Sequence, residues 1–420
     1  MMKEARTIFV YMNWNGNEPI LLGRLYGEYS RGKEMFSFEY DSVWLNTVGE
    51  KISLDPDLKL YAGRQYTPLN KELFGIFSDS CPDRWGRLLM KRHEAIVARK
   101  EGRKPRAFTE SNFLLGVYDQ SRMGALRFCL EKDGVFLSSD QALATPPWTT
   151  LRKLEAASYA FENDESGLEE KWLNQLLAPG SSLGGARPKA TVQDVNGSLW
   201  IAKFPSKNDE YNSGAWEKVV HDLAKLCALN VPESRLEKFS SNGDTFLVKR
   251  FDREGLRRIH FSSAMTLLGK TDGASGTDGT SYLDMAAFIR SNGVNPKEDL
   301  LELWRRVVFN MCVSNTDDHL RNHGFVLESS GWRLSPLYDV NPIPYGDALS
   351  LNVSQDDSSI SLELALNTAK YYGIKTDHAE KMIYEISETI RTNWEILAKK
   401  YGLSHGAIEY MRPAFSICHI

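Results

Sequence analysis

Hydrophobic residues recur along this chain with two different periods. Near the N-terminus, apolar and polar positions alternate or form short apolar runs, which predicts β-strands over residues 7–12, 21–29 and 35–40. Residues 85–97 are amphipathic with a helical period. After residue 376 the helical period returns, at Ala379, Met382, Ile383, Ile386, Ile390, Trp394 and Leu397. The pattern predicts an α+β protein with a β-rich start and a helical C-terminal part.

A further helical pattern precedes the most polar segment of the C-terminal half. Its apolar positions are Leu300, Leu303, Trp304, Val307, Val308 and Met311. We expect a buried helix there, which delivers residues 315–322 from a rigid support. Two short apolar runs then flank residues 328–331, four turn formers, and predict an antiparallel hairpin. Because a hairpin reverses the chain, Asp339 is expected to return towards Asn322.

Three side chains in this region have the spacing of a kinase catalytic centre. In protein kinases a catalytic-loop Asp accepts the substrate hydroxyl proton, an Asn five residues later holds one magnesium ion, and an Asp after a short hairpin holds another. Asp317, Asn322 and Asp339 match this order. One Asp, one Asn and phosphate oxygens suffice for a hard cation such as Mg²⁺. We therefore predict Asp317 as the base, Asn322 and Asp339 as metal ligands, and His319 as a brace at the ATP site.

Two other interpretations of the same residues exist. Asp and Asn are common in turns, where their side chains bond local main-chain amides. His319 and His323 are four residues apart, which on a helix presents two nitrogens to zinc. Gly324 follows at once, however, and no His-Glu-x-x-His pattern supplies a base for a zinc hydrolase.

Further parts of a nucleotide site occur upstream. Residues 199–204 read as a short strand that carries Lys203, placed to reach ATP phosphates or to be a solvated edge lysine. A helix is predicted from Ser213 to Cys227, closed by Asn230. Glu217, placed in its first turn, pairs with Lys203 in one interpretation and simply favours the helix N-terminus in the other.

A glycine-rich segment at residues 178–189 precedes the Lys203 strand. Glycine lets main-chain amides approach phosphate oxygens, and the cations add charge. The predicted phosphate contacts are Gly184, Gly185, Ala186, Arg187 and Lys189. The segment is neither a Walker A loop nor a G-x-G-x-x-G motif, so a flexible connector is the alternative.

Residues 246–253 form an apolar strand that turns polar after Val248. We expect Lys249, Arg250 and Phe251 to hold adenine, through main-chain groups and the aromatic ring. The alternative is a strand end closed by salt bridges within Arg250–Arg253.

Together these motifs resemble the HipA kinases, toxins of type II toxin-antitoxin systems. The resemblance rests on residues 182–189, 202–205, 248–253, 315–322 and 334–339, and residues 74–87 resemble the segment that couples the family's small domain to its kinase body. One departure is the cationic, proline-containing loop at 184–188. The resemblance implies a protein-kinase-like two-lobed fold, with an N-terminal subdomain at 1–109, a small lobe at 110–255 and a helical catalytic lobe at 256–420.

The same resemblance implies an activity and its partners. The cofactors are ATP and Mg²⁺, and the reaction is phosphate transfer to a serine or threonine of a cytoplasmic protein, aminoacyl-tRNA synthetases being the suggested targets. Ser182 matches the family's autophosphorylated serine, with Ser181 beside it, and phosphate there is expected to repel nucleotide and inactivate the enzyme. The implied partner is a small helix-turn-helix antitoxin of the HipB type, through which the chain meets DNA. A small-molecule kinase and a nucleotide-binding regulatory module are the alternatives.

Composition and charge agree with a cytoplasmic enzyme. The chain has 420 residues, enough for two lobes or more, and its five cysteines form no C-x-x-C pair. We expect reduced cysteines, no signal peptide and no membrane span. The net charge of −4 does not indicate general nucleic-acid binding. The basic run at 99–106 is expected to be a solvated face or to help an antitoxin complex touch DNA phosphates.

Overall fold

The computed structural model describes most of the chain in two compact units. The described residues are 5–419 without 15, 17, 31, 48–51, 138–144, 164–172, 174–175, 177–184 and 186. One unit comprises residues 1–207 and 249–262, and the other comprises residues 208–248 and 263–420. The expected domain boundaries after residues 109 and 255 stay a prediction.

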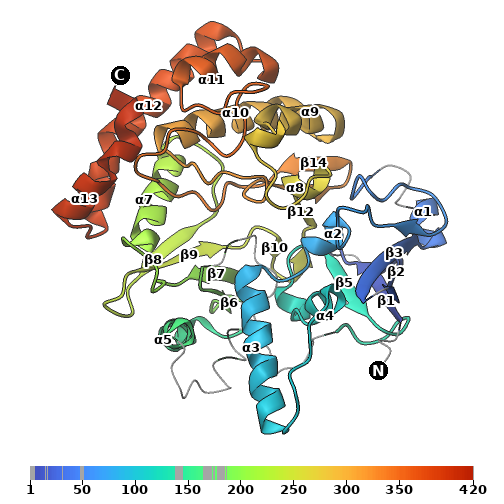
Figure 1. Ribbon diagram of the computed structural model, residues 1–420. Coiled ribbons are helices and arrows are strands. Elements are labelled where there is room, and N and C mark those ends of the chain that lie inside the picture. Colours follow the sequence, from blue (N-terminus) through green and yellow to red (C-terminus); the bar gives the residue numbers. More distant parts are fainter. Residues whose placement is uncertain are drawn as a thin grey trace. The chain divides into compact units, whose positions relative to one another are not determined.

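A five-stranded antiparallel sheet opens the first unit (Figure 1). Its order is β4-β3-β2-β1-β5, with β1 at Arg6–Met12, β2 at Ile20–Ser30, β3 at Lys33–Tyr40, β4 at Gln65–Tyr66 and β5 at Leu126–Cys129. The register of β1 against β2 shifts between Val10 and Tyr11. The three predicted N-terminal strands are therefore confirmed.

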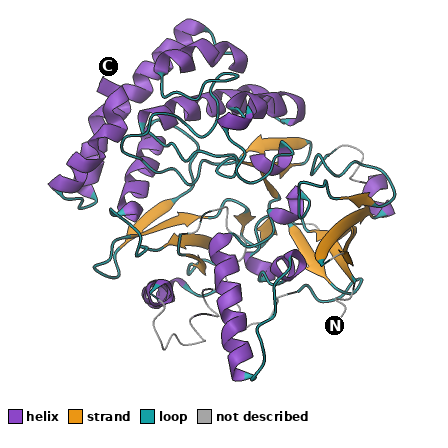
Figure 2. Cartoon of the chain, viewed as in Figure 1, coloured by secondary structure: helices purple, strands orange, loops and turns teal. Residues whose placement is uncertain are grey.

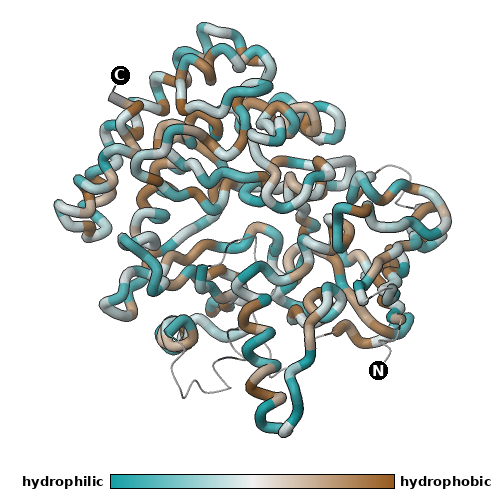
Figure 3. Tube along the Cα trace, in the orientation of Figure 1, coloured by the Kyte–Doolittle hydropathy of each residue, from teal (hydrophilic) through white to brown (hydrophobic). Residues whose placement is uncertain are grey.

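The rest of the first unit contains helices and two small hairpins. The helices are α1 (Ser42–Thr47), α2 (Gly75–Ser78), α3 (Arg84–Lys100), α4 (Glu110–Leu115) and α5 (Leu151–Glu162), with short 3-10 helices η1 (Asp119–Ser121) and η3 (Trp148–Thr150). The hairpins are β6 (Lys189–Gln193) with β7 (Leu199–Lys203), and β10 (Arg253–Glu254) with β11 (Arg257–Arg258). In Figure 3 hydrophobic and hydrophilic positions alternate along α3, as its predicted amphipathic pattern requires.

The second unit is mostly helical (Figure 2). Its helices are α7 (Ser213–Leu226), α8 (Ala264–Leu267), α9 (Tyr282–Asn292), α10 (Pro296–Cys312), α11 (Leu362–Thr368), α12 (Thr376–Lys400) and α13 (His405–Met411), with 3-10 helices η4 (Gly276–Asp278), η5 (Ala369–Tyr372) and η6 (Arg412–His419). Two antiparallel pairs accompany them: β8 (Ser234–Glu237) with β9 (Thr245–Lys249), and β13 (Gly324–Glu328) with β14 (Gly331–Leu334). The short strand β12 (Phe261–Ser263) lies where the chain passes from one unit to the next. The predicted helices at 300–311 and after 376, and the hairpin around 328–331, are confirmed.

Two details of α7 differ from the prediction. The helix ends at Leu226, earlier than the expected Cys227, and Ala228 takes a left-handed conformation with φ of 53°. Alanine there is costly, and the sequence gives no sign of it because glycine or asparagine is the usual residue. Glu217 lies in the second turn of α7, since the first turn contains no acidic residue. The helix N-terminus therefore does not explain this buried carboxylate.

The basic run near the end of α3 is partly neutralised. Glu94 forms ion pairs with Arg103 and Arg106, and Arg103 also pairs with Glu101. The hydrogen bond from Arg103 is the main reason why the pKa of Glu94 is lowered to about 2. Two of the cations expected to face solvent or DNA are thus engaged with carboxylates of the same unit.

Candidate functional site

Helix α10 delivers the segment that carries the predicted catalytic residues. Its first turn contains Pro296 at the N-terminus, and its apolar face is buried around Trp304, whose indole nitrogen donates to the Ala365 carbonyl at 2.9 Å. The helix ends at Cys312, and Ser314 then turns the chain with a left-handed φ of 50°. The polar loop at 314–322 therefore starts from a buried support, as predicted.

Asp317 and Asn322 are held together by this loop. The Asn322 amide nitrogen donates to the Asp317 main-chain carbonyl at 2.8 Å, so this bond does not use the Asp317 carboxylate, which is 73% exposed. The Asn322 Oδ1 atom is buried and has no hydrogen-bond partner among the described residues. The same loop thus carries an accessible carboxylate and a buried amide oxygen whose hydrogen-bonding capacity is unused.

The hairpin β13–β14 precedes Asp339, as the sequence predicted. Phe325 pairs with Leu334 in its register, and the neighbouring Tyr338 hydroxyl donates to the Arg321 carbonyl at 2.8 Å. Asp339 itself has a left-handed φ of 56°, which is unusual for a residue other than glycine. The negative charge of Asp339 contributes to the raised pKa of Asp317, so the two carboxylates lie within electrostatic range.

The residues of this loop fit a magnesium ion that is shared with nucleotide phosphates. Mg²⁺ takes oxygen ligands and usually retains waters, so it is bound by one or two protein groups plus substrate oxygens. The unpartnered Asn322 Oδ1 is a suitable oxygen, and Asp339 supplies a carboxylate. Among the described residues no three His, Cys, Asp or Glu side chains cluster as a metal site. The donor set therefore suits a cation that arrives with its own oxygen ligands.

The electrostatic surroundings tune Asp317. Restricted hydration raises the pKa of its carboxyl above the usual 3.8, the neighbouring His319 lowers it, and the charges of Asp339 and Asp318 raise it. The His319 Nε2 atom is 3.9 Å from the Asp317 Oδ1 atom. The His319 ring therefore lies close to the Asp317 carboxylate, at a distance too long for a hydrogen bond.

This contact leads to a prediction about pH. If Asp317 acts as a base, it must be ionised, so activity falls as pH drops through its raised pKa. Replacing His319 by Gln removes a charge that, when protonated, lowers this pKa. We expect the acidic limb of the kcat/KM profile to move to higher pH in His319→Gln. An unchanged limb would show that Asp317 does not set it.

Directly beside Asp317, a buried polar network fixes the loop. The Asp318 Oδ2 atom accepts hydrogen bonds from the Tyr282 hydroxyl at 2.5 Å and the Asn310 amide at 2.6 Å, and His323 Nε2 lies 2.8 Å away. All four side chains are buried. Sequence reasoning missed this role of Asp318. The only local signal was its five-residue separation from His323.

The same network gives no support to the zinc interpretation of the two histidines. His323 Nε2 contacts the buried Asp318, whereas His319 Nε2 faces Asp317. In the described part of the chain, neither histidine belongs to a group of three or more side chains that could hold a metal ion.

The segment after Asp339 lies on the catalytic loop. The Ile343 amide donates to the Ser314 carbonyl at 3.1 Å, and the Ser350 hydroxyl donates to the Thr316 carbonyl at 2.7 Å. A Cβ added to Gly346 would come within 2.3 Å of the Thr316 side chain, so only glycine allows this approach. These contacts fix the main chain of the loop at Ser314 and Thr316, directly before Asp317.

Some of the predicted phosphate-binding residues of the first unit are described by the structure, and others are not. Gly184 and Ala186 lie outside the described residues, as do Ser181 and Ser182, the predicted autophosphorylation sites. Lys203, at the end of β7, is nearly buried and so is no solvated edge lysine. Its contact with ATP and its pairing with Glu217 stay predictions.

Three neighbours of Lys203 are also described. Gly185 has a left-handed φ of 89°. Arg187 is half-buried, and its Nε donates to the Phe204 carbonyl at 3.1 Å. Lys189 is buried in an ion pair with Asp83 at 2.9 Å, and Asp83 also caps α3 through Gly86. The side chain of Lys189 is therefore engaged within the protein, contrary to its predicted role towards phosphate.

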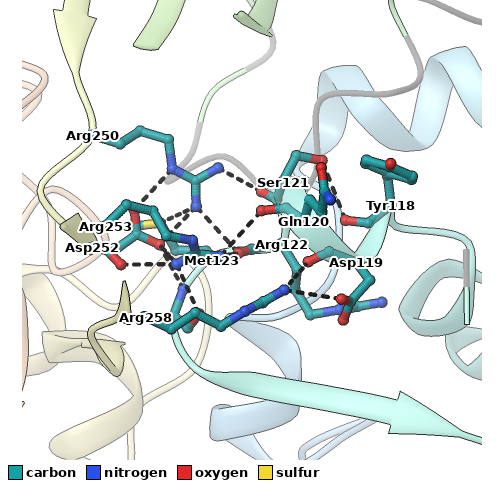
Figure 4. A network of polar contacts seen from close by, with 11 residues as sticks. Tyr118, Asp119, Gln120, Ser121, Arg122, Met123, Arg250, Asp252, Arg253 and Arg258 are labelled. Atoms are coloured by element: carbon teal, nitrogen blue, oxygen red, sulfur yellow. Dashed lines mark hydrogen bonds and ion pairs between the residues drawn. The ribbon is translucent and has the colours of Figure 1, made fainter. Parts of the chain in front are cut away.

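The predicted adenine segment differs from expectation at Arg250. Its guanidinium is buried and bonds Asp252 and the carbonyls of Ser121 and Arg122 (Figure 4). Its main-chain amide donates to the Leu199 carbonyl at 2.9 Å. Arg250 thus serves the protein interior, and the salt-bridged strand end considered above is present. Contacts of Lys249 and Phe251 with adenine stay predictions.

Comparisons with known proteins agree on one family. Residues 181–394 match the model of the HipA-like C-terminal domain. The chain is 30% identical over 191 residues to "Putative kinase Y4mE" of Sinorhizobium fredii, covering 40% of this chain and 43% of that protein. It is 26% identical over 246 residues to "Putative kinase" of Haemophilus influenzae, covering 53% and 70%. The match thus spans less than half of the first relative's length.

A solved structure extends the likeness over nearly the whole chain. HipA of Shewanella oneidensis MR-1, in a complex with HipB and its operator DNA, superposes with a TM-score of 0.68 at 16% identity and covers 98% of this chain and 96% of its own. The predicted α+β fold of the HipA kinases is therefore confirmed. The chain belongs to the HipA-like family. Among the described residues, no helix is long and apolar enough to cross a membrane.

Proposed function

We propose that this protein is an ATP-dependent serine/threonine protein kinase of the HipA family. The observation that carries the proposal is the loop in which the exposed Asp317 carboxylate lies beside the unpartnered Asn322 amide oxygen, with Asp339 in electrostatic range. A site with a free base and unfilled oxygen ligands suits in-line phosphoryl transfer, where positioning and charge neutralisation supply most of the catalysis. The names of the relatives support a kinase.

We assign a part in the proposed reaction to each residue of the candidate site. Asp317 accepts the proton of the attacking hydroxyl, and His319 keeps its pKa from rising further. Asn322 and Asp339 hold Mg²⁺, which neutralises charge on the phosphates when bound. Lys203 is proposed to contact the phosphates. The buried Asp318 network keeps the loop in place during turnover.

Regulation and partners follow from the family. We propose that Ser182, or Ser181 beside it, receives phosphate from the chain's own centre and that the added charge weakens nucleotide binding. The partner is a small helix-turn-helix antitoxin of the HipB type, and DNA is met through it. The S. oneidensis HipA, solved with HipB and operator DNA, supports this assignment.

The acceptor class can be tested with a fractionated cell extract. The native chain is incubated with Mg²⁺ and γ-labelled ATP, together with either the protein fraction or the small-molecule fraction, followed by phosphopeptide mapping. We expect label on serine or threonine of the chain and of an extract protein, and loss of both with a chelator. Label only in the small-molecule fraction would contradict the protein-kinase proposal. ATP binding without any transfer would favour a regulatory binding module.

A further inference from the structure

The main chain just after Lys249 is anchored by buried arginines and aspartates, all within the first unit (Figure 4). We call this set the arginine network; its members are Arg122, Arg250, Arg253, Arg258, Asp119 and Asp252. Their side chains are buried or nearly so. The network joins two segments that are more than a hundred residues apart in the sequence.

Asp252 is the centre of the network. Its Oδ1 accepts from Arg250 Nε at 2.8 Å, and its Oδ2 accepts from Arg250 Nη2 at 2.7 Å, Arg253 Nη1 at 2.7 Å and the Gly124 amide at 2.8 Å. Its main-chain carbonyl accepts from the Ile259 amide at 3.0 Å. One carboxylate therefore ties together both arginines and the turn that precedes β5.

The turn at 120–124 supplies the other half of the network through its carbonyls. Arg250 Nη1 donates to Ser121 at 2.5 Å, and Arg253 Nη2 donates to Arg122 at 2.5 Å. Arg253 Nη1 also donates to the Gly124 carbonyl at 3.0 Å. Gly124 has a left-handed φ of 73°, and a Cβ there would lie 3.2 Å from the Phe261 nitrogen. The carbonyls of the turn thus accept hydrogen bonds from both arginines, and Gly124 allows the close approach to Phe261.

The charges of the network indicate a role in geometry more than in stability. Arg127 also forms an ion pair with Asp119, so guanidiniums outnumber carboxylates around the network. Burial opposes ionisation of Asp252, yet the adjacent arginines hold its pKa at about 2. Burial lowers the pKa of Arg253 to about 9. Buried ion pairs often add little net stability, but their hydrogen bonds fix the segments that they join in one arrangement.

That arrangement fixes the predicted adenine segment. The Arg250 amide is fixed to the Leu199 carbonyl of β7, and the Phe251 ring packs against Phe261 with centroids 5.9 Å apart. Lys249 is the last residue of β9 and Phe251 follows in a bend, so the bond of the Arg250 amide fixes the main chain between these two residues. Recognition of a base by main-chain groups needs them within about 0.5 Å of the productive geometry.

We propose that Asp252 and Arg253 are positioning residues, which hold the Lys249–Phe251 main chain for adenine by fixing it to the turn at 120–124. This inference rests on the proposed function, because it assumes that the segment reads adenine. It makes a turn of the first unit, within the predicted small lobe, a determinant of base selectivity, although no residue of that turn needs to touch the nucleotide.

Calorimetry on the full chain tests the proposal with two variants. Arg253→Gln removes donors to the turn, and Gly124→Ala disturbs the same turn without a change of charge. We expect each to raise the Kd for Mg-ATP about tenfold. We also expect the preference for ATP over GTP to fall by a similar factor, while the Kd for Mg-triphosphate stays unchanged. A merely destabilised protein would not lose base selectivity alone.

Lys71→Gln is the matched control. It breaks the Lys71–Asp57 ion pair, which has a 2.5 Å contact in the same unit, and we expect native ATP affinity and base preference. If Arg253→Gln and Gly124→Ala both bind ATP and GTP as the native chain does, the positioning role is wrong. If the native chain binds neither nucleotide, the proposed function itself fails. The two failures are therefore distinguishable.

Discussion

Asp317→Asn should abolish phosphate transfer and leave the affinity for Mg-ATP nearly unchanged. The amide has the shape of the carboxylate but cannot accept the hydroxyl proton, and loss of a general base costs on the order of 10²–10⁴ in rate. The loop should survive, because Asn322 bonds the main-chain carbonyl of Asp317 and not its side chain. Single-turnover transfer and calorimetry on the same samples measure the two quantities.

Asp356→Asn provides the control for this variant. Asp356 is an exposed carboxylate of the same unit, and the same chemical change there should leave transfer at the native rate. Native-like transfer by Asp317→Asn would contradict the assigned base. Loss of transfer in both variants would point to a general charge effect.

The largest effect on stability is expected at Asp318. Asp318→Ala leaves the Tyr282 hydroxyl, the Asn310 amide and the His323 ring without their common acceptor in a buried position. Each unsatisfied buried group carries its own desolvation penalty, so we expect a loss of about 3 kcal/mol. Thermal and denaturant unfolding, followed by probes of the second unit, measure it.

Asp347→Ala is the control for Asp318→Ala, because it also removes a negative charge but breaks no buried network. Asp347 is exposed, and its removal should change stability by less than about 0.5 kcal/mol. Asp318→Asn keeps one acceptor oxygen and should lie between the two. An Asp318→Ala protein as stable as the native one would show that the network contributes no more than surface polar contacts do.

Much of this architecture could be predicted from local sequence patterns. The periodicity of Leu300, Trp304 and Met311 predicted a buried helix because apolar residues recur there at helical intervals, although the last two turns of the helix are buried on every side. The turn formers at 328–331 predicted the hairpin for a similar local reason. The order of Asp317, Asn322 and Asp339 could be read because the loop and the hairpin connect them within a short stretch of chain.

Long-range pairings could not be read in this way. Lys189 and Arg250 were assigned to nucleotide because cations near a glycine-rich loop or a strand end suit phosphate and adenine. Lys189 pairs with Asp83, 106 residues away, and Arg250 bonds the Ser121 carbonyl, 129 residues away, in addition to the local ion pair with Asp252 that the alternative interpretation included. A single sequence contains no periodic signal that links such positions. The role of Asp318 was hidden likewise, since one of its donors, Tyr282, lies 36 residues upstream.

The central claim is that Asp317, Asn322 and Asp339 form a phosphoryl-transfer centre. Its most direct test is the intact mass of the purified chain after incubation with Mg-ATP, compared with Asp317→Asn and Asp339→Asn treated identically. The account predicts addition of a phosphoryl group to the native chain and to neither variant. Equal phosphorylation of all three proteins would contradict it.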